Sequence, residues 1–253
     1  MRLLITADLH GNLRQLEWLV DNASTVDAVI VAGDLVDRAG HTPLAEQQGH
    51  VVRTLQAARQ RAAVLVASGN HDVDEGGRSA HWLHRLAAGG CIVDGATAVF
   101  DDVAITLCPW RPPAIAEASL SLQLGHTSVP VGCRWLWVHH EPPHGTAVAR
   151  ARRTSHGCTA LRRAIELHAP HGVIAGHVHD APFHDGGSWL DRLDGTWLVN
   201  PGRQPGDTPA HVEIDLDTET MTWRSHGRCE DRALASVPRS MPADAAAATL
   251  PLA

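Results

Sequence analysis

Residues able to bind metal ions follow short apolar runs at five places in the sequence. They are Asp8 and His10, Asp34, Asn70, His139 and His140, and His177 and His179. Carboxylate oxygens, carboxamide oxygens and imidazole nitrogens suit divalent first-row metal ions. Two such ions about 3.5–4 Å apart can hold both the attacking and the leaving oxygen of a phosphoryl transfer. The joint occurrence of an Asp-x-His pair and a Gly-His-x-His pair therefore predicts a two-metal site.

These five places are also the ends of predicted β-strands. Apolar runs predict strands at residues 2–7, 28–32, 62–67, 134–138 and 172–175. Apolar residues at helical spacing predict helices at residues 13–20, 44–61 and 157–168. Short β-like runs within residues 91–107 and 189–224 indicate that the strands form two sheets. The predicted fold class is α/β (α+β), a sandwich of two mixed sheets flanked by helices, with the polar residues along one edge.

Asp34 illustrates why the five places must be considered together. It follows the apolar run at residues 29–32, and Gly33 allows the chain to turn sharply before it. A second carboxylate, Asp37, comes three residues later. A carboxylate at a strand end can also form a turn or cap the next helix. The other four places favour a ligand role for Asp34.

The composition indicates one globular domain. The chain has 253 residues, of which 44% are hydrophobic and 19% charged. We expect a single domain over residues 1–230 and an Ala/Pro-rich, mobile tail over residues 231–253. No apolar run approaches about 20 residues, which predicts no membrane span. The apolar run at residues 1–6 is too short for a signal peptide, so we expect a cytoplasmic protein.

Several classes of chemistry are disfavoured by the composition. The net charge of −7 gives no strong signal for nucleic-acid binding. All 21 basic residues are Arg and Tyr is absent, which excludes a lysine Schiff base and a tyrosine nucleophile. The five cysteines are an odd number without a Cys-x-x-Cys pair, so neither a zinc knuckle nor a disulfide framework is predicted.

The order of the motifs resembles that of calcineurin-like metallophosphoesterases from residue 1 to about residue 202. The motifs are Asp8-Leu9-His10, Gly33-Asp34-Leu35-Val36-Asp37, Gly69-Asn70-His71-Asp72, His140-Glu141-Pro142-Pro143 and Gly176-His177-Val178-His179. The resemblance implies a four-layer αββα sandwich with both metals at the edge of the inner sheets. Its closest match is the small branch that includes bacterial Icc-related and animal metallophosphoesterase-domain proteins.

The resemblance also implies the metal ligands. Metal one would be held by Asp8, His10, Asp34 and His179. Metal two would be held by Asp34, Asn70, His140 and His177, with Asp34 as the bridge. His140 is preferred to His139 because only His140 has the family's spacing to Pro142. The cofactors would be two divalent ions, with Mn expected and Fe, Ni, Co or Zn as alternatives.

His71 and Asp37 are the candidate catalytic residues. In the family, the residue matching His71 protonates the leaving alkoxide or orients the phosphate, and a histidine titrates in a suitable range. Asp37 would accept a hydrogen bond from the far ring nitrogen of His71. Alternatively, His71 braces its loop. Asp72 is interpreted as a helix cap or a loop brace.

Three further residues are candidates for substrate binding. Arg38 and Arg111 could hold phosphate oxygens through a bidentate guanidinium, although Arg38 could equally be a surface residue. Trp110 could line the substrate mouth and stack on a leaving group, or it could fill the gap between the sheets. Residues 200–202 predict a turn that closes against the metal edge and has a structural role.

The resemblance implies hydrolysis of a phosphoester by a metal-activated water. We expect a phosphodiesterase acting on a small or nucleotide-like phosphoester. The alternatives are a phosphomonoesterase, a serine/threonine-type protein phosphatase, and a non-catalytic scaffold of the same fold. The complete set of seven ligand positions favours an enzyme over the scaffold.

Overall fold

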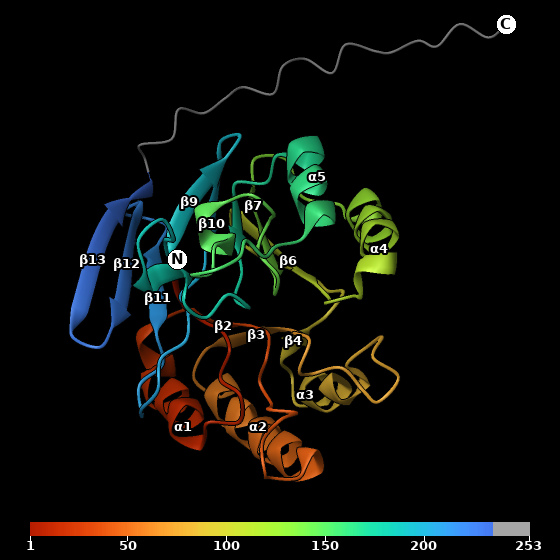
Figure 1. Cartoon of the computed structure of the whole chain (residues 1–253), viewed down its shortest axis with the longest axis vertical. Coiled ribbons are helices and arrows are strands. Elements are labelled where there is room, and N and C mark those ends of the chain that lie inside the picture. The colour runs from red at the N-terminus through yellow and green to blue at the C-terminus, as the bar shows by residue number, and fades with distance from the viewer. Residues whose placement is uncertain (235–253) are drawn as a thin grey trace, which may run out of the picture.

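Two β-sheets packed face to face form the centre of the structure, a computed structural model that describes residues 1–234 (Figure 1). The first sheet has the spatial order β13 (Arg228–Ala233), β12 (Thr220–Ser225), β11 (His211–Asp215), β1 (Arg2–Thr6), β2 (Ala28–Ala32), β3 (Ala63–Ala67), β4 (Ile92–Val93). The second has the order β5 (Thr97–Phe100), β6 (Val103–Cys108), β7 (Arg134–His139), β8 (Gly172–Ile174), β10 (Thr196–Val199), β9 (Leu190–Leu193). Strands β1 to β4 run parallel, as do β6, β7, β8 and β10, and antiparallel strands extend both sheets.

Helices cover the outer face of each sheet (Figure 1). The first sheet is covered by α1 (Leu13–Asn22), α2 (Leu44–Arg59) and α3 (His84–Ala88), and the second by α4 (Pro113–His126) and α5 (Thr159–His168). Short 3-10 helices lie in the connections: η1 (Ala23–Thr25), η2 (His81–Leu83), η3 (Ala147–Ala149) and η4 (Ala181–Phe183). The predicted four-layer αββα sandwich is confirmed.

Three apolar layers hold this sandwich together. Ile30 and Val138 belong to the layer between the two sheets. Leu16 of α1 packs in the layer beneath the first sheet, and Ile165 of α5 packs in the layer against the second. Both faces of the central parallel strands are thus covered, which explains why all five residues of β2 are buried and apolar. These rigid strands fix the loops that follow them.

The loop after β1 is fixed by a helix cap. The side chain of Asn12 accepts hydrogen bonds from the backbone N–H groups of Arg14 and Gln15 at the start of α1. The bonds satisfy donors that would otherwise lack partners in the first turn. The predicted cap at Asn12 is confirmed, and it holds the chain directly after His10.

The sequence-based boundary at residue 231 is wrong for the first residues of the predicted tail. Strand β13 continues to Ala233 and pairs antiparallel with β12, for example at Met221 and Arg232. Its polar residues lie on an edge strand, where one side of the ladder needs no partner. The remainder of the predicted tail, residues 235–253, lies outside the described residues.

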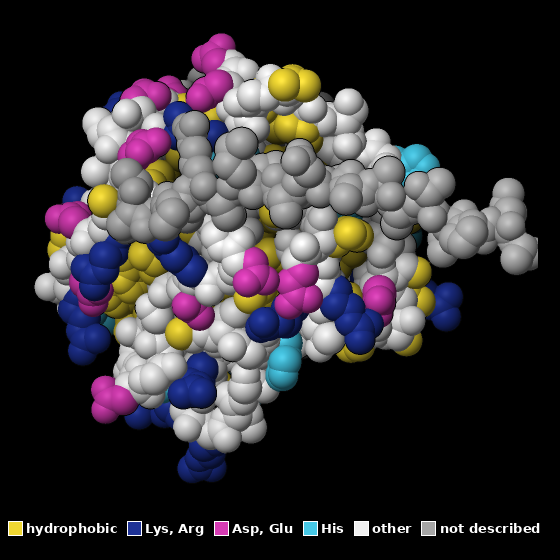
Figure 2. Space-filling model, turned by 90° about the horizontal axis from the view of Figure 1, so that it is seen from above, with side chains coloured by type: hydrophobic (Ala, Val, Ile, Leu, Met, Phe, Trp, Pro, Cys, Tyr) yellow, Lys and Arg dark blue, Asp and Glu magenta, His cyan; other side chains and the backbone are white. Residues whose placement is uncertain are grey.

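The surface carries charges of both signs. Figure 2 shows a face on which Arg side chains and acidic side chains are interspersed. Over residues 1–234, none of the helices has the length and apolar character needed to cross a membrane.

Candidate metal centre

The structure brings the candidate ligands to one edge of the two sheets. Asp8 and His10 follow β1, Asp34 follows β2, Asn70 follows β3, His140 follows β7, and His177 and His179 follow β8. Because these strands are parallel within each sheet, their carboxyl ends meet at the same edge. The structure thus places all of these polar residues at the edge of the sheets where the sequence predicts them.

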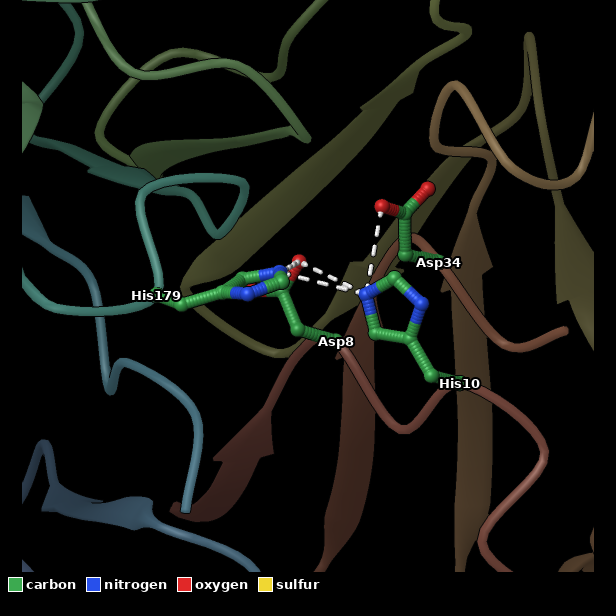
Figure 3. Close-up of side chains that lie close together, drawn as sticks. All are labelled: Asp8, His10, Asp34 and His179. Carbon is green, nitrogen blue, oxygen red and sulfur yellow. Dashed lines mark hydrogen bonds and ion pairs between the residues drawn. The ribbon is translucent and has the colours of Figure 1, made fainter. Parts of the chain in front are cut away.

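One group of side chains consists of Asp8, His10, Asp34 and His179, which point toward one another (Figure 3). Their potential ligand atoms all lie within 4.8 Å of one another. The Nε2 atoms of His10 and His179 are 3.1 Å apart. His10 Nε2 lies 3.6 Å from Asp34 Oδ2, and His179 Nε2 lies 3.3 Å from Asp8 Oδ1. Four potential ligands thus surround one position.

A second group consists of Asp34, His140 and His177, whose potential ligand atoms also lie within 4.8 Å of one another. Asn70 completes it, with Oδ1 2.9 Å from His177 Nδ1 and 3.1 Å from His140 Nε2. His140 Nε2 is 3.2 Å from Asp34 Oδ2. The two groups match the two predicted ligand sets, residue by residue.

Asp34 is the residue that the two groups share. Its Oδ1 accepts a hydrogen bond of 2.8 Å from the backbone N–H of His71. Its Oδ2 is left to face both groups, 3.6 Å from His10 Nε2 and 3.2 Å from His140 Nε2. A single carboxylate oxygen therefore lies between the two candidate metal positions.

The surroundings of His140 favour a positive charge at its Nε2 atom. Its Nδ1 donates to the Ala32 carbonyl at 2.7 Å, so Nε2 faces the oxygens of Asp34 and Asn70. Burial, the largest single influence, would lower the pKa of His140. The charge of Asp34 and the hydrogen bond to it, together with the charge of Asp8 and the bond to Ala32, more than offset burial and raise the pKa to about 10. For Asp34, burial would raise the pKa, but the charge of His140 and the hydrogen bonds to His140 and to the His71 N–H together hold the pKa well below its usual range. A bound cation could replace this proton and attract the same three atoms, as a histidine oriented from its other nitrogen does in metal sites.

Two other imidazoles of the cluster, those of His10 and His177, are in the neutral state that metal binding requires. Burial lowers the pKa of His10 to about 4 despite the opposing charges of Asp34 and Asp8. Burial, followed by the charge of His140, also lowers the pKa of His177 to about 4. Both side chains are therefore neutral near pH 7, the state required of a histidine ligand. The donor set fits divalent first-row ions.

Four residues of the cluster have strained backbones. Asp8, His10, Asp34 and His177 have φ angles of 57°, 45°, 54° and 66°. Non-glycine residues rarely adopt positive φ, and such strain persists where the surrounding structure enforces it. Gly33, with φ of 90°, provides the sharp turn before Asp34 that the sequence predicts. Such a concentration of strained residues is typical of functional sites, and residue types alone do not reveal it.

His139 and His140 point to different surroundings. His140 belongs to the cluster, whereas His139 Nδ1 lies 2.7 Å from the Glu141 carbonyl. Successive residues of a strand project to opposite faces, which explains the difference. The structure thus places His140, as expected, and not His139 among the candidate ligands.

We expect His139 to make the metal-free protein acid-sensitive. Burial lowers its pKa from 6.5 to about 4, so between these pH values the unfolded chain binds a proton that the folded chain does not. Stability must therefore fall as pH falls through this window, by up to about 1.4 kcal/mol per pH unit from this group. Urea unfolding of wild type and His139→Asn at pH 6.5, 5.5 and 4.5 should show the shallower decline in the variant. Parallel declines would contradict this prediction.

The expected hydrogen bond between Asp37 and His71 is absent. His71 Nδ1 instead accepts a bond of 3.2 Å from the backbone N–H of Arg38, and Asp37 Oδ1 lies 3.6 Å from the same nitrogen. The Asp37 Oδ1 atom accepts from the backbone N–H of Ala39 at 2.9 Å. The hydrogen-bond partner of the His71 ring is therefore a backbone N–H group in the turn that follows Asp34. Neutral His71 would carry its proton on Nε2.

Asp72 braces the loops, as one of its two predicted roles requires. It is buried, and its Oδ1 accepts hydrogen bonds from the backbone N–H groups of Leu35 and Val36 at 2.9 and 3.2 Å. Its Oδ2 accepts from the Gly69 N–H at 2.8 Å. One carboxylate therefore ties the loop that carries Asp34 to the loop that carries Asn70.

The guanidinium groups of Arg38 and Arg111 are engaged with the protein. Arg38 Nη1 donates to the carbonyl of Val73, and Arg111 Nη1 donates to the carbonyl of Arg78 at 2.8 Å. Trp110 is half-buried, and its backbone N–H donates to Ser68 Oγ at 3.1 Å. These contacts fasten the loops around the cluster.

A pocket of about 180 Å³ adjoins the cluster. His10 and Asp37 are among its lining residues, together with His41 and Thr42 before α2 and His50 on α2. Sequence reasoning gave the last three no role, because nothing in their types or spacing sets them apart from other surface residues.

The chain belongs to the calcineurin-like phosphoesterase superfamily, whose domain model matches residues 1–219. Among solved structures, it is similar to TT1561 of Thermus thermophilus, with a TM-score of 0.59 and 16% identity over 92% of this chain and 98% of that one. It is also similar to a dimetal phosphatase from Danio rerio, with a TM-score of 0.56 and 16% identity over 92% and 98%. Purple acid phosphatase PPD1 of yellow lupin (Lupinus luteus) gives a TM-score of 0.53 and 14% identity, over 94% of this chain and 52% of that one. No curated protein sequence matches the chain.

Proposed function

We propose that this protein is a dinuclear-metal-dependent phosphodiesterase that acts on small or nucleotide-like substrates. The observation that carries the proposal is the position of Asp34 Oδ2, which faces the imidazoles of both His10 and His140. Membership of a phosphoesterase family and the similarity of fold to a dimetal phosphatase support it.

The proposed ligands form two sets that share Asp34. Metal one takes Asp8, His10, Asp34 and His179, and metal two takes Asp34, Asn70, His140 and His177. Four imidazoles and three oxygen donors without a thiolate suit Mn, Fe, Ni, Co or Zn, and we propose Mn²⁺. Bound there, the ions would supply a water of lowered pKa and would neutralise charge on the phosphoryl oxygens.

His71 is the proposed proton donor to the leaving oxygen. Its Nδ1 is occupied by the N–H of Arg38, which leaves Nε2–H as the donor of the neutral ring. Its ring packs edge-on to that of His10 with centroids 4.5 Å apart, and its side chain is 26% exposed. Substrate can therefore reach a proton donor that is held next to the cluster. Asp37 contributes negative charge beside the same ring.

The surroundings support a small substrate. The pocket of about 180 Å³ beside His10 and Asp37 could hold a small group of a substrate. Trp110, which is not among the lining residues of this pocket, is the proposed stacking surface for an aromatic leaving group. On the face that Figure 2 shows, basic and acidic side chains are interspersed, whereas nucleic-acid-binding proteins gather basic side chains on one face.

Hydrolysis of two chromogenic substrates by the Mn²⁺-loaded full chain tests the proposal. We expect turnover of bis-p-nitrophenyl phosphate to exceed that of p-nitrophenyl phosphate, and EDTA to abolish both. Faster turnover of the monoester would contradict a phosphodiesterase and would indicate a phosphomonoesterase instead. No turnover with Mn²⁺, Fe²⁺, Ni²⁺ or Zn²⁺ would contradict an enzymatic function and favour a scaffold.

A further inference from the structure

The segment after β10 is fastened to the loop that carries His177 and His179. The side-chain amide of Asn200 donates to the carbonyls of Gly176 and Val178, each at 3.1 Å. The backbone N–H of Arg203 then donates to the His179 carbonyl at 3.0 Å. The predicted turn at residues 200–202 thus closes against the metal edge, and it places Arg203 beside a candidate ligand of metal one.

The same segment is fastened to the loop that carries His10. Gln15 of α1 donates from Nε2 to the Gln204 carbonyl at 2.9 Å. Asn12, which follows His10 by two residues, donates from Nδ2 to the Gly206 carbonyl at 3.0 Å. The Gln204 side chain is itself buried, and its Oε1 accepts from the N–H of His226 at 3.0 Å. The backbone at Arg203 is therefore held between the loops of His10 and His179.

The guanidinium of Arg203 differs from those of Arg38 and Arg111. Its side chain is exposed, and within residues 1–234 no hydrogen bond or ion pair engages it. Arg38 and Arg111, in contrast, donate to backbone carbonyls. The backbone of Arg203 lies next to the candidate ligand His179, because the Arg203 N–H donates to the His179 carbonyl. A cation without a partner thus lies at the rim of a centre proposed to bind phosphoryl groups.

We propose that Arg203 binds the phosphoryl oxygens of the substrate and of the phosphate product from the metal-one side. This inference rests on the proposed function. A guanidinium offers paired N–H donors that match two oxygens of a phosphoryl group, and an arginine already without partners loses no internal bond on binding. Sequence motifs do not reveal this role, because Arg203 lies outside every metal-ligand motif and only the fold brings it beside His179.

Binding of inorganic phosphate to the Mn²⁺-loaded full chain tests this role. Titration calorimetry should show that Arg203→Ala binds phosphate about tenfold more weakly than wild type, because hydrogen bonds to a charged group are lost. Arg203→Lys should fall between the two, since it keeps the charge without the paired donors. Arg14→Ala is the matched control, because Arg14 is an exposed arginine on α1 whose side chain pairs with Glu17. Its phosphate affinity should equal that of wild type.

Metal content, measured by plasma mass spectrometry, separates anion binding from a structural role. Both Arg203 variants should retain the metal stoichiometry of wild type. Unchanged phosphate affinity in Arg203→Ala would overturn the inference, as would equal loss of metal from both variants. Failure of wild type to hydrolyse any phosphoester would overturn the proposed function instead, and the phosphate titration would still report on Arg203.

Discussion

Replacement of Asp34 by Asn should abolish phosphoester hydrolysis and weaken both metal sites. Asn keeps the shape of the side chain and an oxygen that can accept the bond from the His71 N–H. It removes the negative charge from the position between His10 and His140. Under the proposed ligand sets both ions would lose a shared anionic ligand at once, and metal ions supply several kcal/mol of transition-state stabilisation. We therefore expect kcat to fall by about 1000-fold or more.

Metal analysis and circular dichroism should accompany the Asp34→Asn assay. The variant should bind fewer than two ions per chain while keeping the wild-type secondary structure. Asp102→Asn is the control, because Asp102 is an exposed carboxylate that pairs with Arg134 at the far end of β7. Its kcat should stay within about twofold of wild type, as is usual for an exposed surface substitution. An active Asp34→Asn protein with two bound ions would contradict the proposed ligand sets.

Replacement of Gly69 by Ala should also destroy the site, through packing alone. A Cβ at this position would lie 2.2 Å from Asp34 Oδ1 and 2.4 Å from the Asp34 backbone nitrogen. Neither atom can move away unless the loop that carries Asp34 separates from the loop that carries Gly69. Asp72 holds these two loops together, in part through the Gly69 N–H. We expect loss of metal binding, at least a roughly 100-fold lower kcat, and a destabilisation of about 1–3 kcal/mol.

A second glycine of the same loop provides the matched control. A Cβ at Gly76 would meet no atom within 4 Å, and its φ is not in the left-handed region. Gly76→Ala should therefore keep the activity, the metal content and the urea unfolding midpoint of wild type. Full activity in Gly69→Ala would show that the loops carrying Asp34 and Asn70 need not lie this close together.

The sequence reveals much of the fold because its signals are local. Apolar runs mark the parallel strands, since both faces of these strands are covered. Asn12 marks the start of α1, since a cap bonds to the next few residues. Strand β13 is not predicted from the sequence because its residues are mostly polar and form no apolar run. It is a strand because it pairs with β12.

The candidate site is predictable in its residue types and less so in its contacts. The Asp, Asn and His residues at strand ends converge because parallel strands share an edge. The partner of His71 Nδ1 is a backbone N–H, which no choice of side chain reveals. Arg203 is more than twenty residues beyond His179 in the chain, and only the hydrogen bond between their backbones brings them together.

A crystal structure of the Mn²⁺-loaded full chain, with anomalous data collected at the manganese absorption edge, tests the central claim most directly. The shared position of Asp34 Oδ2 predicts two anomalous peaks about 3.5–4 Å apart, one beside His10 and His179 and the other beside His140 and His177. Asp34 should lie between the peaks and contact both. A single peak, or two peaks that Asp34 does not join, would contradict a dinuclear centre built on this carboxylate.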